Sequence, residues 1–206
     1  MKPLPLWLLS SALTAAGWPG AFAHQDSHAT PDASSTTAAG SALSRSTVQV
    51  RLPAVRVRQQ SGRLLNFDVA VDDTRPVLLN FFYTTCTGIC LQTSKVFAAA
   101  QERLGLDADQ VQMISVSIDP TQDTPARLAE YAEHFAAGPQ WSFATGSQEA
   151  IDALQRAFNV YRPDKMSHTP VTFIRSPGSR HWVRLDGFAS PDQLLREARM
   201  QATALP

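Results

Sequence analysis

The two cysteines of this 206-residue chain, Cys86 and Cys90, lie four positions apart in the stretch FFYTTCTGIC. Residues four apart on a helix face the same side, so both sulfurs can bond to each other or bind one ion. Cys86 is expected just before a helix, where free backbone N–H groups and the helix dipole favour the thiolate, and Cys90 one turn inside. The spacing therefore predicts a redox-active or metal-binding pair.

The elements that must position this pair alternate along the chain as strands and helices. Residues 48–57 and 63–67, separated by RQQSG, predict an N-terminal hairpin. Apolar runs predict buried strands at 77–83, 111–119 and 141–145, and amphipathic patterns predict helices at about 88–104, 125–137 and 147–158. A closing antiparallel pair is expected at 171–176 and 181–188, and a last helix from Ser190-Pro191. This order predicts an α/β, thioredoxin-like fold with a central mixed β-sheet flanked by helices.

His168 is the predicted third member of the site. It lies 78 residues beyond Cys90, directly before Thr169-Pro170 and the apolar run 171–174. In a thioredoxin-like domain the proline that starts this strand is typically cis and faces the cysteine loop, so His168 would approach both sulfurs. Two thiolates and one imidazole suit copper, particularly Cu(I), whereas structural zinc would need a fourth ligand. The alternative is that His168 is an ordinary polar residue beside a strand.

The N-terminus indicates export. Residues 1–23 combine a basic start at Lys2, an apolar core and a small-residue site ending in Ala21-Phe22-Ala23, as in a signal peptide. Alternatively the segment stays as an uncleaved anchor that tethers the domain to the inner membrane, since 21 uncharged residues separate Lys2 from His24. Both interpretations predict a periplasmic protein.

Composition separates a linker from one domain. Residues 24–47 contain 16 Ser, Thr, Ala or Gly among 24 positions, so they cannot bury enough surface to fold and are interpreted as a disordered linker. The 159 residues at 48–206 fit a single domain with a sizeable core. Without the signal segment the chain carries 17 basic and 18 acidic side chains and no Lys/Arg run, which argues against a nucleic-acid partner.

In an exported protein, an even number of cysteines is first read as a structural disulfide. Bridging Cys86 and Cys90 would close a loop of about five residues, worth about 2 kcal/mol, against nearly 5 kcal/mol for a loop of about a hundred residues. A purely structural staple is therefore disfavoured against a functional pair.

Four blocks of sequence resemble one family. They are LLNFFYTTCTGIC, SVSIDPTQDTP with Asp119, Pro120, Asp123, Thr124 and Pro125, LQRAFNVY, and the downstream His168. Across about 60–200 the chain resembles the Sco/SenC proteins, thioredoxin-like copper-binding factors for assembly of respiratory cytochrome oxidase. The resemblance implies that Cys86, Cys90 and His168 are copper ligands, for Cu(I) or Cu(II).

The resemblance also implies a role and partners. The protein would be a metallochaperone, delivering copper to the binuclear copper site of a cytochrome c oxidase subunit or reducing that site's cysteines. Because an oxidising periplasm favours the disulfide, an upstream thiol reductase or copper donor is an expected second partner.

Two enzymatic alternatives remain open. In a thiol–disulfide oxidoreductase, Cys86 would attack a substrate disulfide and Cys90 would resolve the mixed disulfide. In a peroxidase, Cys86 would pass through a sulfenic acid. The peroxidase is the weaker alternative, because peroxiredoxins generally have threonine three residues before the cysteine and Tyr83 stands there.

Asp119, at the end of the second buried strand, also has two interpretations. It could hydrogen-bond near the site and tune the thiolates. Alternatively, Asp119 and Asp123 build the turn and cap the next helix.

Overall fold

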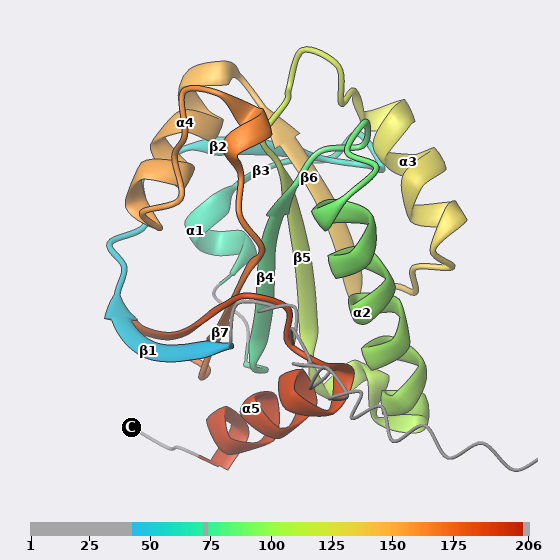
Figure 1. Cartoon of the computed structure of the whole chain (residues 1–206), viewed down its shortest axis with the longest axis vertical. Coiled ribbons are helices and arrows are strands. Elements are labelled where there is room, and N and C mark those ends of the chain that lie inside the picture. Colours follow the sequence, from blue (N-terminus) through green and yellow to red (C-terminus); the bar gives the residue numbers. More distant parts are fainter. Residues whose placement is uncertain (1–42, 72–73, 204–206) are drawn as a thin grey trace, which may run out of the picture. The chain divides into compact units, whose positions relative to one another are not determined.

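A computed structural model describes residues 43–71 and 74–203, which form an eight-stranded mixed sheet with helices packed against it (Figure 1). The order of strands across the sheet is β1-β8-β7-β4-β5-β6-β2-β3. The strands are β1 (Ser44–Gln49), β2 (Arg56–Gln59), β3 (Leu64–Asn66), β4 (Val77–Phe82), β5 (Gln112–Ser117), β6 (Trp141–Gly146), β7 (Val171–Arg175) and β8 (His181–Asp186). The helices are α1 (Phe67–Ala70), α2 (Ile89–Leu104), α3 (Pro125–His134), α4 (Gln148–Ala157) and α5 (Pro191–Thr203). The described residues also include the short 3-10 helices η1 (Gly105–Gln110) and η2 (Lys165–Ser167).

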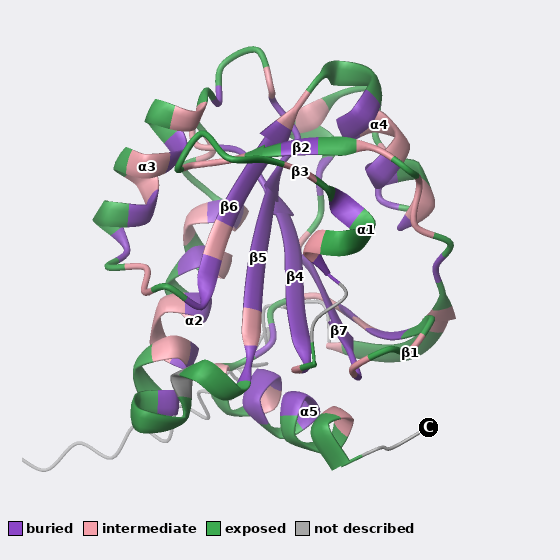
Figure 2. Ribbon diagram, turned by 180° about the vertical axis from the view of Figure 1, so that it is seen from behind, coloured by how far each residue is buried: buried purple, intermediate pink, exposed green. Residues whose placement is uncertain are grey.

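The centre of the sheet confirms the predicted buried strands. β4 pairs in parallel with β5, and β5 in parallel with β6, while β7 pairs antiparallel with the other side of β4. Every residue of β4 is buried, as expected for an apolar run covered on both faces. Figure 2 shows β4 and β5 buried over nearly their whole length, whereas β2 is largely exposed. The cysteine loop therefore leaves from the end of a fully buried strand.

Two aromatic clusters cover the two faces of the sheet. Phe81 and Phe82 are neighbours in β4 and so point to opposite faces. Phe82 packs against Tyr131 of α3, with ring centroids 5.0 Å apart. Phe81 packs against Phe158 at the end of α4, at 5.5 Å, and against Phe173 of β7, at 6.3 Å. Helices thus lie on both sides of the sheet, as a thioredoxin-like order predicts.

Helix α2 carries Cys90 and confirms the helix predicted at 88–104. Phe97 is fully buried and packs against Trp141 of β6, with ring centroids 5.7 Å apart, so the helix is docked on the sheet. The helix ends at Leu104, and the capping residue Gly105 has a φ of 52°, in the left-handed region that glycine adopts without strain.

Side-chain caps fix the starts of the later helices. The Thr124 hydroxyl accepts the backbone N–H of Arg127 at the start of α3, and Pro125 holds the first helical position. At α5, Ser190 and Gln193 exchange hydrogen bonds between side chain and backbone, which makes a capping box. The helix predicted from Ser190-Pro191 is therefore confirmed.

The edges of the sheet depart from the prediction. The hairpin is present as β2 and β3, which pair antiparallel, but the stretch 48–57 is not one strand. Its beginning belongs to β1, which pairs with β8 at the opposite edge of the sheet. The sheet also includes residues 44–47, which were predicted to belong to the linker. Arg45 explains part of this, since its guanidinium contacts the Glu197 carboxylate of α5 at 2.7 and 3.1 Å.

The predicted signal segment, 1–23, and the linker as far as residue 42 lie outside the described residues. Within the part of the chain that the structure describes, none of the helices is both long and apolar enough to cross a membrane.

Candidate functional site

The two cysteines lie where β4 gives way to α2. β4 ends at Phe82 and α2 begins at Ile89, so Cys86 is in the connecting loop and Cys90 is the second residue of the helix. Both thiols are free. The Cys86 sulfur accepts the backbone N–H of Cys90 at 3.4 Å, so it takes the place of a helix cap that no other side chain supplies. The predicted position of the pair at a helix start is confirmed.

The two thiols have opposite acid–base properties. Burial raises the pKa of Cys86, but hydrogen bonds with Cys90, with the Gly88 backbone and with Tyr83 outweigh it, so this pKa lies below its ordinary value. Cys90 is only 2% exposed, and burial followed by its hydrogen bond to Cys86 raises its pKa. Cys86 is thus the sulfur that ionises first, and it is also the more exposed of the two.

The buried carboxylate of Asp123 holds the start of the cysteine loop. It accepts the backbone N–H of Thr84 at 3.0 Å and the Thr84 hydroxyl at 2.5 Å. It also accepts the hydroxyl of Ser117, the last residue of β5, at 2.5 Å. Since Thr124 caps α3, the interpretation of Asp123 as the helix cap is wrong. Its side chain instead ties the cysteine loop to the neighbouring strand.

Asp119 links a second segment to the same end of the sheet. Its carboxylate pairs with the ammonium group of Lys165 in η2 at 2.5 Å and accepts the Thr121 hydroxyl at 2.9 Å. In Figure 1, the orange part of the chain that carries η2 lies at the same end of the sheet as the start of α2. Asp119 therefore positions the segment that leads to His168, and it does not cap the next helix.

Tyr83 connects this segment to Cys86. Its hydroxyl donates a hydrogen bond to the Met166 sulfur at 3.3 Å. The Lys165 ammonium lies 5.3 Å from the centre of the Tyr83 ring. Burial is the main cause that raises the pKa of Tyr83 to about 12, and the hydrogen bond with Cys86 is the second. The phenol therefore keeps its proton. The single phenol proton can be donated either to the Met166 thioether or to the Cys86 thiolate.

His168 is buried beside β4, with 7% of its surface exposed. Its Nε2 lies 2.9 Å from the Phe81 carbonyl oxygen. A carbonyl can only accept, so Nε2 carries the proton and Nδ1 carries the lone pair that a metal ion can use. Burial lowers the pKa of His168, which keeps the ring neutral. No described peptide bond is cis, so Pro170 is trans, unlike the proline typical of thioredoxin-like domains.

The three predicted site residues come to one end of the sheet, but they do not form a complete ligand set. Across residues 43–71 and 74–203, no group of three His, Cys, Asp or Glu side chains is arranged to hold a metal ion. His168 faces a backbone carbonyl, while the cysteines are linked to each other and to Tyr83. A three-coordinate site would require the histidine and the cysteine loop to move toward each other.

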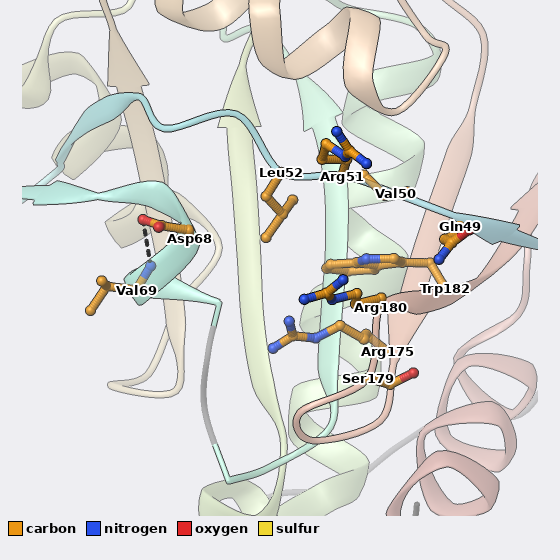
Figure 3. A pocket seen from close by; sticks show the side chains of 10 residues that line it. All are labelled: Gln49, Val50, Arg51, Leu52, Asp68, Val69, Arg175, Ser179, Arg180 and Trp182. Carbon is orange, nitrogen blue, oxygen red and sulfur yellow. Dashed lines mark hydrogen bonds between the residues drawn. The ribbon is translucent and has the colours of Figure 1, made fainter.

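A cavity at the opposite end of the sheet is not part of this site. It has a volume of about 640 Å³ and is lined by residues that include Arg51, Asp68, Arg175, Arg180 and Trp182 (Figure 3). Arg175 pairs with the first residue of β4, whereas the cysteine loop follows the last. The cavity is lined by neither cysteine nor by His168.

Comparison with known proteins places the sequence in a family. The family model of SCO1/SenC matches residues 60–203, more than half of the chain. The chain belongs to the SCO1/SenC family. The SenC protein of Rhodobacter capsulatus is 28% identical over 126 residues, a match that covers 61% of this chain and 55% of that protein. The chain thus spans about half the length of such SCO1/SenC relatives.

Solved structures of Sco proteins share the fold. Arabidopsis thaliana ScoI, described with copper bound, is 24% identical, with a TM-score of 0.59 over 71% of this chain and 94% of that one. BsSco, described as having a disulfide switch and as a member of a family of cytochrome c oxidase assembly proteins, is 21% identical, with a TM-score of 0.64 over 77% of this chain and 96% of that one. The predicted thioredoxin-like fold is confirmed.

Sequence reasoning missed the residues that support the site. In the sequence, Tyr83 argues only against a peroxidase, and no motif marks Met166 as part of the site. Their closeness in sequence to the predicted site residues was a usable signal, because Tyr83 is three residues before Cys86 and Met166 is two before His168. Their contact with each other was not predictable, because it depends on how two distant segments meet in the fold.

We expect Asp123→Asn to destabilise the reduced protein by about 1.5–3 kcal/mol, because an amide group would face a donor where a buried carboxylate now accepts three hydrogen bonds. Urea denaturation measures the change. Asp152→Asn, at the end of a surface hydrogen bond on α4, is the control and should stay within about 0.5 kcal/mol of the native chain. Equal stability of the two variants would contradict the role of Asp123.

We expect iodoacetamide to label Cys86 at least about tenfold faster than Cys90 at neutral pH, since each unit of pKa changes the thiolate fraction by about ten. Because the pKa of Cys86 is lowered, its rate should level off at a lower pH than that of an ordinary thiol. Mass spectrometry of the reduced protein over a pH series measures both rates. The urea-unfolded chain, in which both should react alike, is the control, and faster labelling of Cys90 in the folded protein would refute the assignment.

Proposed function

We propose that this protein binds copper as cargo through Cys86, Cys90 and His168 and delivers it during assembly of the binuclear copper site of cytochrome c oxidase. The observation that carries the proposal is the pair of free thiols at the start of α2, with a neutral histidine bonded to the end of β4, the strand that leads into α2. Two thiolates and an imidazole are soft ligands that favour Cu(I).

The residues present fit the ion. Cys86 is predisposed to ionise, and a bound cation would favour the loss of the Cys90 proton in turn. The His168 ring donates Nε2–H to a backbone carbonyl, an arrangement that commonly orients histidines that bind metals through the other nitrogen. Copper binding would then bring His168 and the cysteine loop together, because they are not preassembled.

The target and compartment follow from the family and the N-terminus. Membership of SCO1/SenC supports a role in oxidase assembly, and a solved Sco protein carries copper. The signal-like segment 1–23 supports export to the periplasm, with cleavage or retention as an anchor. Since an oxidising compartment favours the disulfide, a thiol reductase or copper donor would act upstream.

We expect one Cu(I) to bind the reduced full chain, and His168→Ala to weaken that binding by about 10- to 100-fold. Anaerobic competition with a Cu(I) chelator measures the affinity, and circular dichroism checks the fold. His134→Ala, at the exposed end of α3, is the matched control and should bind as the native chain does. The double variant Cys86→Ser, Cys90→Ser should lose specific binding, and its retention would refute the proposal.

The opposite properties of the two thiols support a second candidate function, thiol–disulfide exchange. The Cys86 thiolate would attack one sulfur of a substrate disulfide and form a mixed disulfide, while the other substrate sulfur leaves as a thiolate. Buried Cys90 would then lose its proton, displace the substrate from Cys86 and leave a Cys86–Cys90 disulfide. The substrate would gain the two electrons, as in reduction of an oxidase subunit's copper-site cysteines.

We expect Cys90→Ser to accumulate a mixed disulfide through Cys86, because the resolving sulfur is missing. Non-reducing electrophoresis of cells that express the variant, followed by mass spectrometry of the adduct, measures it. Cys86→Ser, which keeps only the buried thiol, should trap little. Without an adduct on Cys90→Ser, this second function would be rejected.

A further inference from the structure

Met166 is an exposed sulfur beside the cysteine loop. Its residue surface is 73% exposed, so most of the side chain is open to solvent. A thioether is neutral and soft, so it binds Cu(I) without having to lose a proton.

Contacts on both sides hold Met166 in position. Its backbone N–H donates to the Asp164 carboxylate, which caps η2. The preceding residue, Lys165, is paired with Asp119 at the end of β5, and His168, two residues on, is bonded to Phe81 of β4. The thioether is therefore presented to solvent from a segment that is anchored to the sheet.

Tyr83 places this sulfur near the thiols. Its hydroxyl donates to Met166 and lies within hydrogen-bonding reach of Cys86. One hydroxyl group thus separates the exposed thioether from the more exposed thiol. His168, by contrast, is buried and turned to a carbonyl.

We infer that Met166 is an entry and exit ligand for Cu(I), which binds the incoming ion at the surface and passes it to Cys86 and Cys90. This inference rests on the proposed copper function and names the residue through which the cargo moves. The transfer is a ligand exchange in which copper remains Cu(I). The ion leaves its donor for the Met166 sulfur, which gives up the hydrogen bond from Tyr83, and each thiol that then binds copper releases its proton to water.

The test uses the full chain, reduced and anaerobic, with methyl-¹³C methionine. On addition of one equivalent of Cu(I), the methyl signal of Met166 should shift, whereas that of Met113, buried in β5, should not. Met166→Leu, which keeps the size but removes the sulfur, should slow release of bound Cu(I) to the chelator bathocuproine disulfonate by about tenfold, the lower end of what removing a supporting group costs a metal site.

The matched control is Met200→Leu, because Met200 is also exposed, at 50%, but lies on α5. It should release copper at the native rate. Tyr83→Phe removes the hydrogen bond and leaves the thioether, so it should keep the Met166 methyl shift.

The outcomes separate the two proposals. If Met166→Leu releases copper as fast as Met200→Leu does, while Cys86→Ser, Cys90→Ser abolishes binding, the entry ligand is refuted and the copper site stands. Loss of the Met166 methyl shift in Tyr83→Phe would also refute it, since the hydroxyl and not the sulfur would be responsible. If the double cysteine variant binds Cu(I) as the native chain does, both proposals fail.

Discussion

The buried carboxylate of Asp123 is the constraint on which the cysteine loop depends. A fully buried charge is tolerated only if its oxygens are satisfied, and here three donors from Thr84 and Ser117 satisfy them. Those donors come from the end of β5 and from the loop between β4 and α2. The loop must therefore keep a fixed path out of β4, which sets Cys86 in front of the first turn of α2. Without that path, the Cys86 sulfur would not cap the helix.

The same end of the sheet receives a second anchored segment. Lys165 reaches Asp119 at the end of β5, and His168 reaches a carbonyl of β4. Two carboxylates four residues apart thus hold two different segments, one with the thiols and one with the histidine. This division explains why the donors are near one another without forming a ready site. Such a site can open and close around a cargo ion, which suits a protein that must also release it.

The helix start makes two chemically identical side chains unequal. Cys86 lies before the helix, where backbone N–H groups and Tyr83 stabilise its thiolate, and Cys90 lies inside, where burial opposes ionisation. An unequal pair suits copper transfer, because the exposed sulfur can exchange ligands first. It equally suits disulfide exchange, with one attacking and one resolving sulfur. The two proposed roles therefore draw on one physical arrangement.

The sequence by itself determined the central strands, the helices and the place of the cysteine pair, because these follow from local periodicity, capping and spacing over a few residues. It also carried the family resemblance through Cys86, Cys90 and His168. Only the tertiary structure decided that β1 joins β8, that Asp123 binds the cysteine loop and that Met166 meets Tyr83. Each of these joins segments from about 40 to more than 100 residues apart, and polar side chains with several available partners do not encode which one they will meet. The direction of the His168 ring belongs to the same class, since the carbonyl that orients it lies 87 residues away in the chain.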